Sequence, residues 1–160
     1  MDVLLVYDSY YGNTLRVAEL YQQEFASKGI MVEVKHVSKI FPEDIDHKKL
    51  LIFGSPTRAF RETPAIKQLL KNKRFAFENR PFFVFDTRID PQDTNSALLH
   101  RLVRWFGYAS GHMNKLLSKR GASQISTDKG YCVMSSEGPL KPEVSHQVAD
   151  HVTEIVPHFR

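Results

Sequence analysis

The sequence predicts one α/β domain spanning residues 1–160, in which a parallel sheet carries helices on both faces. Short apolar runs alternate along the chain with segments whose apolar residues recur every three or four positions. Strands joined in this way by helices run parallel, because each connection must cross back over the sheet. The composition, 42% hydrophobic and 25% charged, is typical of a globular domain. Strands are expected at 2–7, 31–37, 50–54, 81–86 and 122–135.

The expected strands differ in how deeply they should be buried. Residues 50–53 and 81–85 are unbroken apolar runs, which indicate central strands covered on both faces. Residues 31–37 alternate apolar and charged side chains, which favours a strand near the sheet edge. The segment 122–135 contains a turn at 127–130, so it represents either two pieces of one strand or two adjacent strands.

Helices are expected at 14–28, 64–71, 96–106, 110–120 and 142–156. The first has an apolar stripe formed by Val17, Ala18, Tyr21 and Phe25, at the spacing of one helix face. Gly29 follows it in the usual position after a helix. The second begins at Thr63-Pro64, a capping residue followed by proline at the first helical position.

Polar residues follow the first strand directly. A strand, a turn containing Gly12 and then a helix place backbone N–H groups beside Ser9, Asn13 and Thr14. These N–H groups and the positive end of the helix dipole suit a phosphate dianion. The alternative is a connection in which Asn13 or Thr14 caps the helix and no ligand is bound.

Two further polar loops should lie at the same edge of the sheet. Gly54-Ser55-Pro56-Thr57-Arg58 follows the third strand, and Asp86-Thr87-Arg88 follows the fourth. Open α/β sheets bind ligands at the carboxyl ends of their strands. The three loops together therefore predict one ligand site.

The charge pattern narrows the classes of partner. The net charge is +4 with a pI of about 9.2, and the basic residues are scattered among acids. This does not indicate a nucleic-acid groove, whereas a mildly basic surface suits an acidic protein partner. Cys132 is the single cysteine, which excludes an internal disulfide, and it reads as a buried small apolar residue. No apolar run is long enough for a membrane span and no signal peptide is recognised, so a cytoplasmic location is expected.

The three loops resemble those of the flavodoxin family. Residues 9–14 are similar to its phosphate loop for flavin mononucleotide (FMN), and residues 54–57 to the start of its second flavin loop. Residues 85–88 fall where the third is expected, and Glu137-Gly138-Pro139 is also similar to many members. The resemblance implies a flavodoxin-like three-layer sandwich with strand order 2-1-3-4-5 and FMN as the cofactor. The implied FMN-binding residues are Ser9, Tyr10, Tyr11, Gly12, Asn13, Thr14, Ser55, Pro56, Thr57, Arg58, Ala59, Phe60, Asp86, Thr87 and Arg88.

The chain departs from the family pattern in two places. Tyr11 replaces a short hydroxyl residue before Gly12, which puts one phosphate hydroxyl in doubt. The segment 89–106 is longer than expected and contains an additional helix. It could cover the flavin ring, form a partner surface, support a dimer or simply pack on the surface, so both monomer and homodimer stay open.

The leading hypothesis is an electron carrier for a redox partner protein, because no catalytic residues or metal-ligand spacing are recognised. One alternative is an FMN-dependent reductase that uses a quinone or NAD(P)H. Another is a flavin-free binding module on the same fold. Phe60 is the first candidate to stack on the flavin ring, ahead of Trp105 and Tyr108.

Three arginines lie in or beside the implied flavin loops. Arg58, Arg61 and Arg88 outnumber the nearby acids Asp86 and Glu62. A protein tunes a flavin through nearby charge, so these arginines should favour the reduced, anionic flavin. Replacing any of them by Gln should therefore lower the two-electron potential. The alternative is that they point into solvent or pair with acids.

Overall fold

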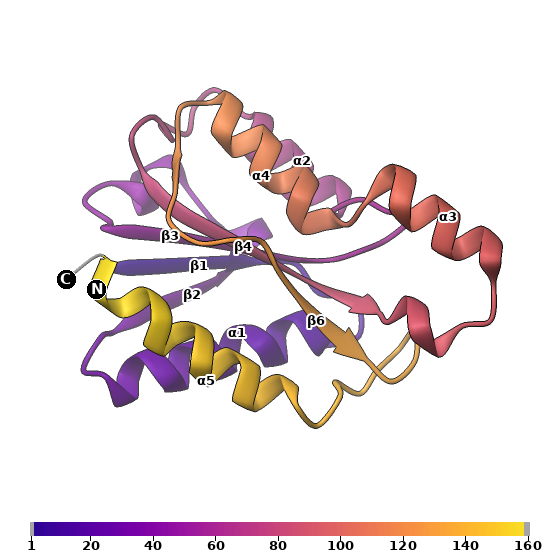
Figure 1. Ribbon diagram of the computed structural model, residues 1–160. Coiled ribbons are helices and arrows are strands. Elements are labelled where there is room, and N and C mark those ends of the chain that lie inside the picture. The colour runs from indigo at the N-terminus through magenta and orange to yellow at the C-terminus, as the bar shows by residue number, and fades with distance from the viewer. Residues whose placement is uncertain (1, 159–160) are drawn as a thin grey trace.

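A parallel sheet forms the middle layer of the computed structural model, which describes residues 2–158 (Figure 1). Its strand order is β2-β1-β3-β4-β5, and β6 pairs with β4 as well. All of these pairings are parallel, as the alternation of strands and helices predicted. The strands are β1 Val3–Tyr7, β2 Val32–His36, β3 Leu50–Pro56, β4 Pro81–Ile89, β5 Ser123–Gln124 and β6 Lys129–Val133.

Helices cover both faces of the sheet. α1 and α5 lie on one face and α2 and α4 on the other, whereas α3 projects at the carboxyl end of the sheet (Figure 1). No helix within residues 2–158 has the length and apolar character needed to cross a bilayer. The α-helices are α1 Asn13–Ser27, α2 Pro64–Lys71, α3 Ala97–Phe106, α4 Ala109–Lys119 and α5 Val144–Ile155. The short 3-10 helices are η1 Val37–Lys39, η2 Pro42–Ile45, η3 Pro91–Asp93 and η4 Val156–His158.

The sheet separates two apolar clusters. β1 shows why, since Val3 and Leu5 point to one face and Leu4 and Val6 to the other. The first cluster lies under α1 and α5 and contains the predicted stripe of α1. The second lies under α2 and α4 and includes Phe53. The central strands are therefore buried on both sides, as their unbroken apolar runs predicted.

A polar network is enclosed within the first cluster. The Tyr21 hydroxyl lies 2.5 Å from the Tyr131 hydroxyl and 2.6 Å from Nδ1 of His151. Nε2 of His151 is 2.7 Å from Oγ of Ser126. Burial lowers the pKa of His151 to about 3, so the ring is neutral at pH 7. These hydrogen bonds satisfy polar groups that would otherwise be costly to bury.

Two features of the predicted sheet were wrong in detail. β4 continues beyond the predicted end at Asp86, so Thr87 and Arg88 belong to the strand and not to a loop, because β6 pairs with residues 85–89. β3 likewise continues to Pro56. The segment 122–135 forms two strands, β5 and β6, that pair with successive parts of β4. The predicted helix boundaries agree with the structure to within two residues.

Candidate functional site

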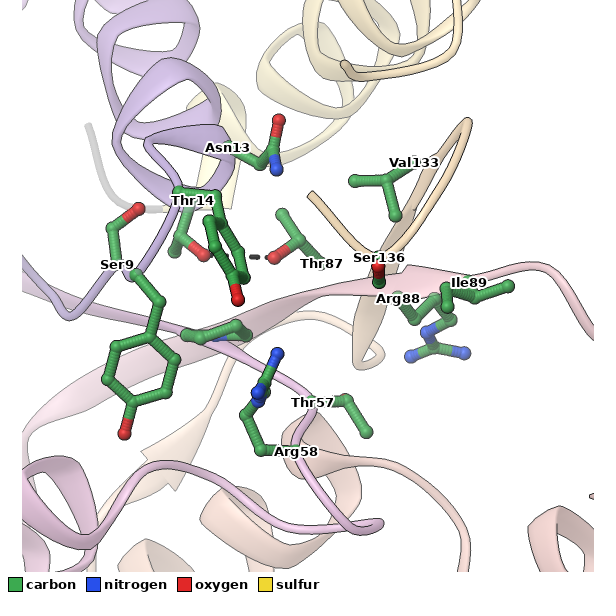
Figure 2. A pocket seen from close by; sticks show the side chains of 13 residues that line it. Ser9, Asn13, Thr14, Thr57, Arg58, Thr87, Arg88, Ile89, Val133 and Ser136 are labelled. Atoms are coloured by element: carbon green, nitrogen blue, oxygen red, sulfur yellow. Dashed lines mark hydrogen bonds between the residues drawn. The ribbon is translucent and has the colours of Figure 1, made fainter. Parts of the chain in front are cut away.

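A pocket lies at the carboxyl ends of β1, β3 and β4 (Figure 2). Its cavity volume is about 80 Å³, below the roughly 300–1,000 Å³ usual for small-molecule sites. All three predicted loop regions contribute to it, because parallel strands bring their carboxyl ends together. The lining residues are Ser9, Tyr10, Tyr11, Asn13, Thr14, Pro56, Thr57, Arg58, Thr87, Arg88, Ile89, Val133 and Ser136.

The N-terminus of α1 meets this pocket without a capping side chain. Gly12 occupies the N-cap position with φ 86°, a left-handed conformation that glycine adopts at little cost. Thr14 Oγ1 is instead 2.9 Å from Thr87 Oγ1, and the Asn13 amide donates to the Glu137 carbonyl at 3.1 Å. The N–H groups of the first turn are therefore oriented as an anion site. Capping by Asn13 or Thr14, the alternative in the sequence, does not occur.

The remaining polar groups of the first loop hold its backbone in place. Ser9 Oγ accepts a hydrogen bond from the Gly12 N–H at 3.1 Å, and the Ser9 N–H donates to Asp8 Oδ1 at 2.8 Å. The same carboxylate oxygen lies 3.2 Å from Nε2 of His36. The loop is therefore shaped before any ligand arrives, which reduces the entropic cost of binding.

The second loop contains a strained turn. Ala59 and Phe60 have φ values of 47° and 65°, and Arg58 and Arg61 exchange backbone hydrogen bonds of 2.8 and 2.9 Å. Two-residue turns with positive φ normally contain Asn or Gly. Such strain persists only where the surroundings enforce it, and it often marks a ligand-binding loop.

The residues on either side of the strained turn form hydrogen bonds to β4 and α4. The Thr57 N–H donates to the Thr87 carbonyl at 2.9 Å, and Thr57 Oγ1 accepts from the Ala109 N–H at 3.1 Å. On the other side of the turn, the buried Glu62 carboxylate lies 2.6 Å from Nδ1 of His112. These contacts over-determine the loop and hold the strained turn at the pocket edge.

The two arginines of the pocket have different surroundings. Arg88 forms two hydrogen bonds to the fully buried Asp86, at 2.6 and 2.7 Å, and its guanidinium lies 3.5 Å from the centre of the Tyr108 ring. Burial alone would lower the pKa of Arg88, but hydrogen bonding and charge from Asp86 outweigh burial and raise it. The charge of Arg88 is therefore compensated within the protein.

Arg58, by contrast, is exposed and reaches toward the first loop. Figure 2 shows its side chain directed from the second loop to the pocket. Its guanidinium carbon lies 5.4 Å from the ring centre of Tyr10 and 5.8 Å from that of Tyr11, distances suited to cation–π attraction. Among the described residues it has no ion-pair partner, so its charge is available to a ligand.

A second pocket, more apolar in its lining, adjoins the first. It lies between the second loop and α3 and has a cavity volume of about 220 Å³. Thr57, Arg88 and Ile89 line both pockets. Of the candidates for ring stacking, Phe60 lines this second pocket with its ring 5.7 Å from that of Phe106. The guanidinium of Arg88 stacks over the Tyr108 ring, so that face of the ring is already occupied. The Trp105 side chain is 78% exposed.

The structure brings most of the predicted site residues together but not all. Ten of the fifteen line the pocket, and Gly12 shapes its loop. Ser55 and Asp86 are fully buried behind it, and Ser55 Oγ accepts from the Thr63 N–H at 3.0 Å. Ala59 and Phe60 belong to the second pocket.

Three lining residues were missed by the sequence analysis. Ile89 lies at the extended end of β4, and Val133 lies at the end of β6, which pairs with it. Ser136 directly precedes the Glu137-Gly138-Pro139 turn, the one signal that pointed to this region. The Asn13 amide confirms that this turn approaches the first loop, and a Cβ on Gly138 would fall 2.3 Å from its oxygen.

Comparison with known proteins places these features in a family. Solved structures of the same fold include flavodoxin 2 of Bacillus cereus, with TM-score 0.78, 16% identity and coverage of 99% of this chain and 100% of that one. Another is a flavodoxin of Fusobacterium nucleatum bound to flavin mononucleotide, with TM-score 0.68, 14% identity and coverage of 99% and 96%. Rubredoxin oxygen:oxidoreductase of Desulfovibrio gigas aligns over 98% of this chain and 35% of its own, with TM-score 0.73 and 17% identity.

No curated protein matches the sequence. The sequence model of the flavodoxin family, in contrast, matches residues 5–148. This match spans all three loop regions of the pocket, and the observed strand order is the one that the resemblance implied. The chain therefore belongs to the flavodoxin family.

Proposed function

We propose that this chain binds FMN in the pocket at the carboxyl ends of β1, β3 and β4 and carries electrons to a redox partner protein. The observation that carries the proposal is the uncapped N-terminus of α1, which opens into a pocket bounded by all three loops. Family membership supports the same cofactor. Bound FMN supplies electron transfer through its flavin ring, and the protein supplies binding and electrostatic tuning.

The residues of the pocket divide into two functional groups. Backbone N–H groups at the start of α1, with the hydroxyls of Ser9 and Thr14, would hold the phosphate. The second loop and the end of β4, with Thr57, Arg58 and Thr87, would hold the remainder of the cofactor. Electron transfer needs no nucleophile or general base, and no residue of the pocket is assigned such a role.

The proposal is tested by the visible spectrum of the purified chain during titration with FMN. A stoichiometric flavin spectrum is expected, together with quenching of the flavin fluorescence on binding. Thr14→Val should weaken FMN binding, because it removes a hydroxyl at the phosphate end, whereas Thr153→Val on the exposed side of α5 should not. A colourless protein that takes up no FMN would contradict the proposal and favour a flavin-free binding module.

A second function is favoured by the adjoining pocket. Its largely apolar lining, next to the candidate FMN site, would suit a planar substrate such as a quinone beside the flavin. An FMN-dependent reductase would be reduced by NADH or NADPH, which would bleach its visible absorption, whereas a carrier would stay oxidised until a partner reduced it. The expected cytoplasmic location stays part of the proposal.

A further inference from the structure

α3 differs from the other α-helices of the described chain in burying none of its residues. α1, α2, α4 and α5 each bury one face against the sheet. Leu98, Trp105 and Phe106 of α3 are 64%, 78% and 53% exposed. An amphipathic helix is stabilised mainly by covering its apolar face, and a large exposed apolar patch commonly marks an interaction site. α3 is therefore a candidate interaction surface.

The exposed helix lies beside the proposed cofactor pocket. The Phe106 ring is 5.7 Å from the Phe60 ring of the second loop, and Leu99 and Val103 line the apolar pocket that shares residues with the candidate FMN site. Figure 1 shows α3 projecting at the carboxyl end of the sheet. A protein that docked on α3 would thus be held close to the cofactor.

The charged residues of α3 itself are all basic. α3 contains His100, Arg101 and Arg104 but no Asp or Glu, and Arg58 and Arg61 are exposed on the adjacent loop. None of these four arginines forms an ion pair within residues 2–158.

The two acids that precede α3 share one lysine, so they offset only part of the positive charge of the four arginines. Asp90 and Asp93 pair with Lys141 at 3.2 and 2.9 Å. Glu62, in the second loop, is buried against His112. The apolar patch is therefore surrounded by a net positive rim.

We propose that α3 and the second loop, here called the α3 surface, dock an acidic redox protein. Carboxylates of that protein would meet Arg58, Arg61, Arg101 and Arg104, and its apolar centre would cover Trp105. This inference rests on the proposed electron-carrier function, because it names the kind of partner that the carrier serves. A second copy of the chain fits less well, since two α3 helices face to face would bring like charges together around one apolar centre.

Trp105 provides a direct reporter of docking, because it is the single tryptophan of the chain. The probe is an acidic [2Fe–2S] ferredoxin, and the control is cytochrome c, a basic redox protein. Titration of the full chain with the ferredoxin at low salt should change the Trp105 emission, and high salt should abolish the change. No change with the ferredoxin, or an equal change with cytochrome c, would overturn the proposal. Because this readout does not need FMN, docking is measured even if the chain binds no flavin.

Charge reversal tests the rim. When the ferredoxin is reduced before mixing with the oxidised FMN-loaded protein, Arg101→Glu with Arg104→Glu should slow electron transfer from the ferredoxin to the flavin at low salt by about tenfold or more. Lys67→Glu with Lys71→Glu, two exposed lysines on α2, changes the net charge equally and should leave the rate within about twofold. Equal losses in both variants would show that only net charge matters and would overturn the proposal.

Sedimentation of the wild-type chain tests whether a second copy of the chain, and not an acidic partner, covers the α3 surface. A monomer at micromolar concentration is expected. A dimer that Trp105→Ser dissociates would assign the α3 surface to a second copy and would contradict docking of an acidic partner. A failed FMN titration with an intact ferredoxin titration would overturn the electron-carrier function and leave the surface standing.

Discussion

The buried network around His151 and the pocket at the carboxyl ends of the strands use similar polar side chains, but they complete their hydrogen bonds differently. In the network, both ring nitrogens of His151 and the hydroxyls of Tyr21 and Tyr131 meet one another or Ser126. At the pocket, the first turn of α1 has no capping side chain, a turn is strained and Arg58 has no acid partner within residues 2–158. The network therefore serves stability, whereas the pocket keeps polar groups available for a ligand.

The largest expected effect comes from the buried ion pair of Arg88 and Asp86 at the pocket. Arg88→Met leaves the Asp86 carboxylate buried without its partner and should cost about 3–5 kcal/mol of the free energy of unfolding. Urea unfolding measures this loss. Adding Asp86→Asn to the same variant should recover part of it, because the isolated charge is gone. A loss below about 1 kcal/mol in the single variant would show that the pair is not part of the stable framework.

The next effect tests the core network through pH. The pKa of His151 falls to about 3 in the folded chain, against about 6.5 when unfolded, so the unfolded state binds the extra proton as the pH drops. Stability from this group is full above about pH 6.5 and should decline by about 2 kcal/mol between pH 7 and pH 5.

Comparison of two variants isolates the contribution of His151. His151→Gln should remove this pH dependence, whereas His146→Gln, on the exposed side of the same helix, should retain it. Urea unfolding at pH 7 and pH 5 provides both values. An unchanged slope in His151→Gln would contradict the assignment.

A smaller effect of opposite sign is expected in the second loop. Ala59→Gly relieves the positive φ of 47° and should stabilise the chain by about 1 kcal/mol, although glycine gains entropy in the unfolded state. Thermal unfolding measures the change. Ala65→Gly, in the exposed first turn of α2, is the control and should destabilise. If Ala59→Gly also destabilised, the turn would not be strained.

The smallest expected effect sharpens the difference between the two arginines of the pocket. Arg58→Gln should lower the two-electron potential of bound flavin by up to about 20 mV, which corresponds to about 1 kcal/mol. Arg88→Gln should lower it less, because Asp86 already compensates that charge. Redox titration of the FMN-loaded variants provides the values. A larger fall for Arg88 than for Arg58 would reverse this interpretation.

Much of the fold follows from local patterns. The apolar runs at 50–53 and 81–85 became central strands, and the stripe of α1 became its buried face. The extension of β4 through Arg88 could not be predicted, because it depends on pairing with β6, more than forty residues later in the chain. The helical spacing of α3 was correct, but the same spacing would equally suit a buried helix, and only the structure shows that none of its residues is fully buried.

In the site, too, features set by neighbouring residues were predicted, whereas contacts between distant residues were not. The residues of the first loop were found because a strand, Gly12 and a helix follow directly in the sequence. The pairing of Arg88 with Asp86 and the reach of Arg58 to Tyr10 depend on side-chain packing. Of the three arginines predicted to tune the flavin, Arg88 pairs with Asp86, as the alternative allowed, whereas Arg58 has no ion-pair partner within residues 2–158.

The central claim, that the uncapped start of α1 holds a phosphate, is tested most directly by comparing FMN with riboflavin. The two ligands share the flavin ring and the ribityl chain but differ in the phosphate. Fluorescence titration of the chain should give an affinity for FMN at least about 100-fold higher, equivalent to about 2.7 kcal/mol from the phosphate contacts. Equal affinities for the two ligands would contradict the account.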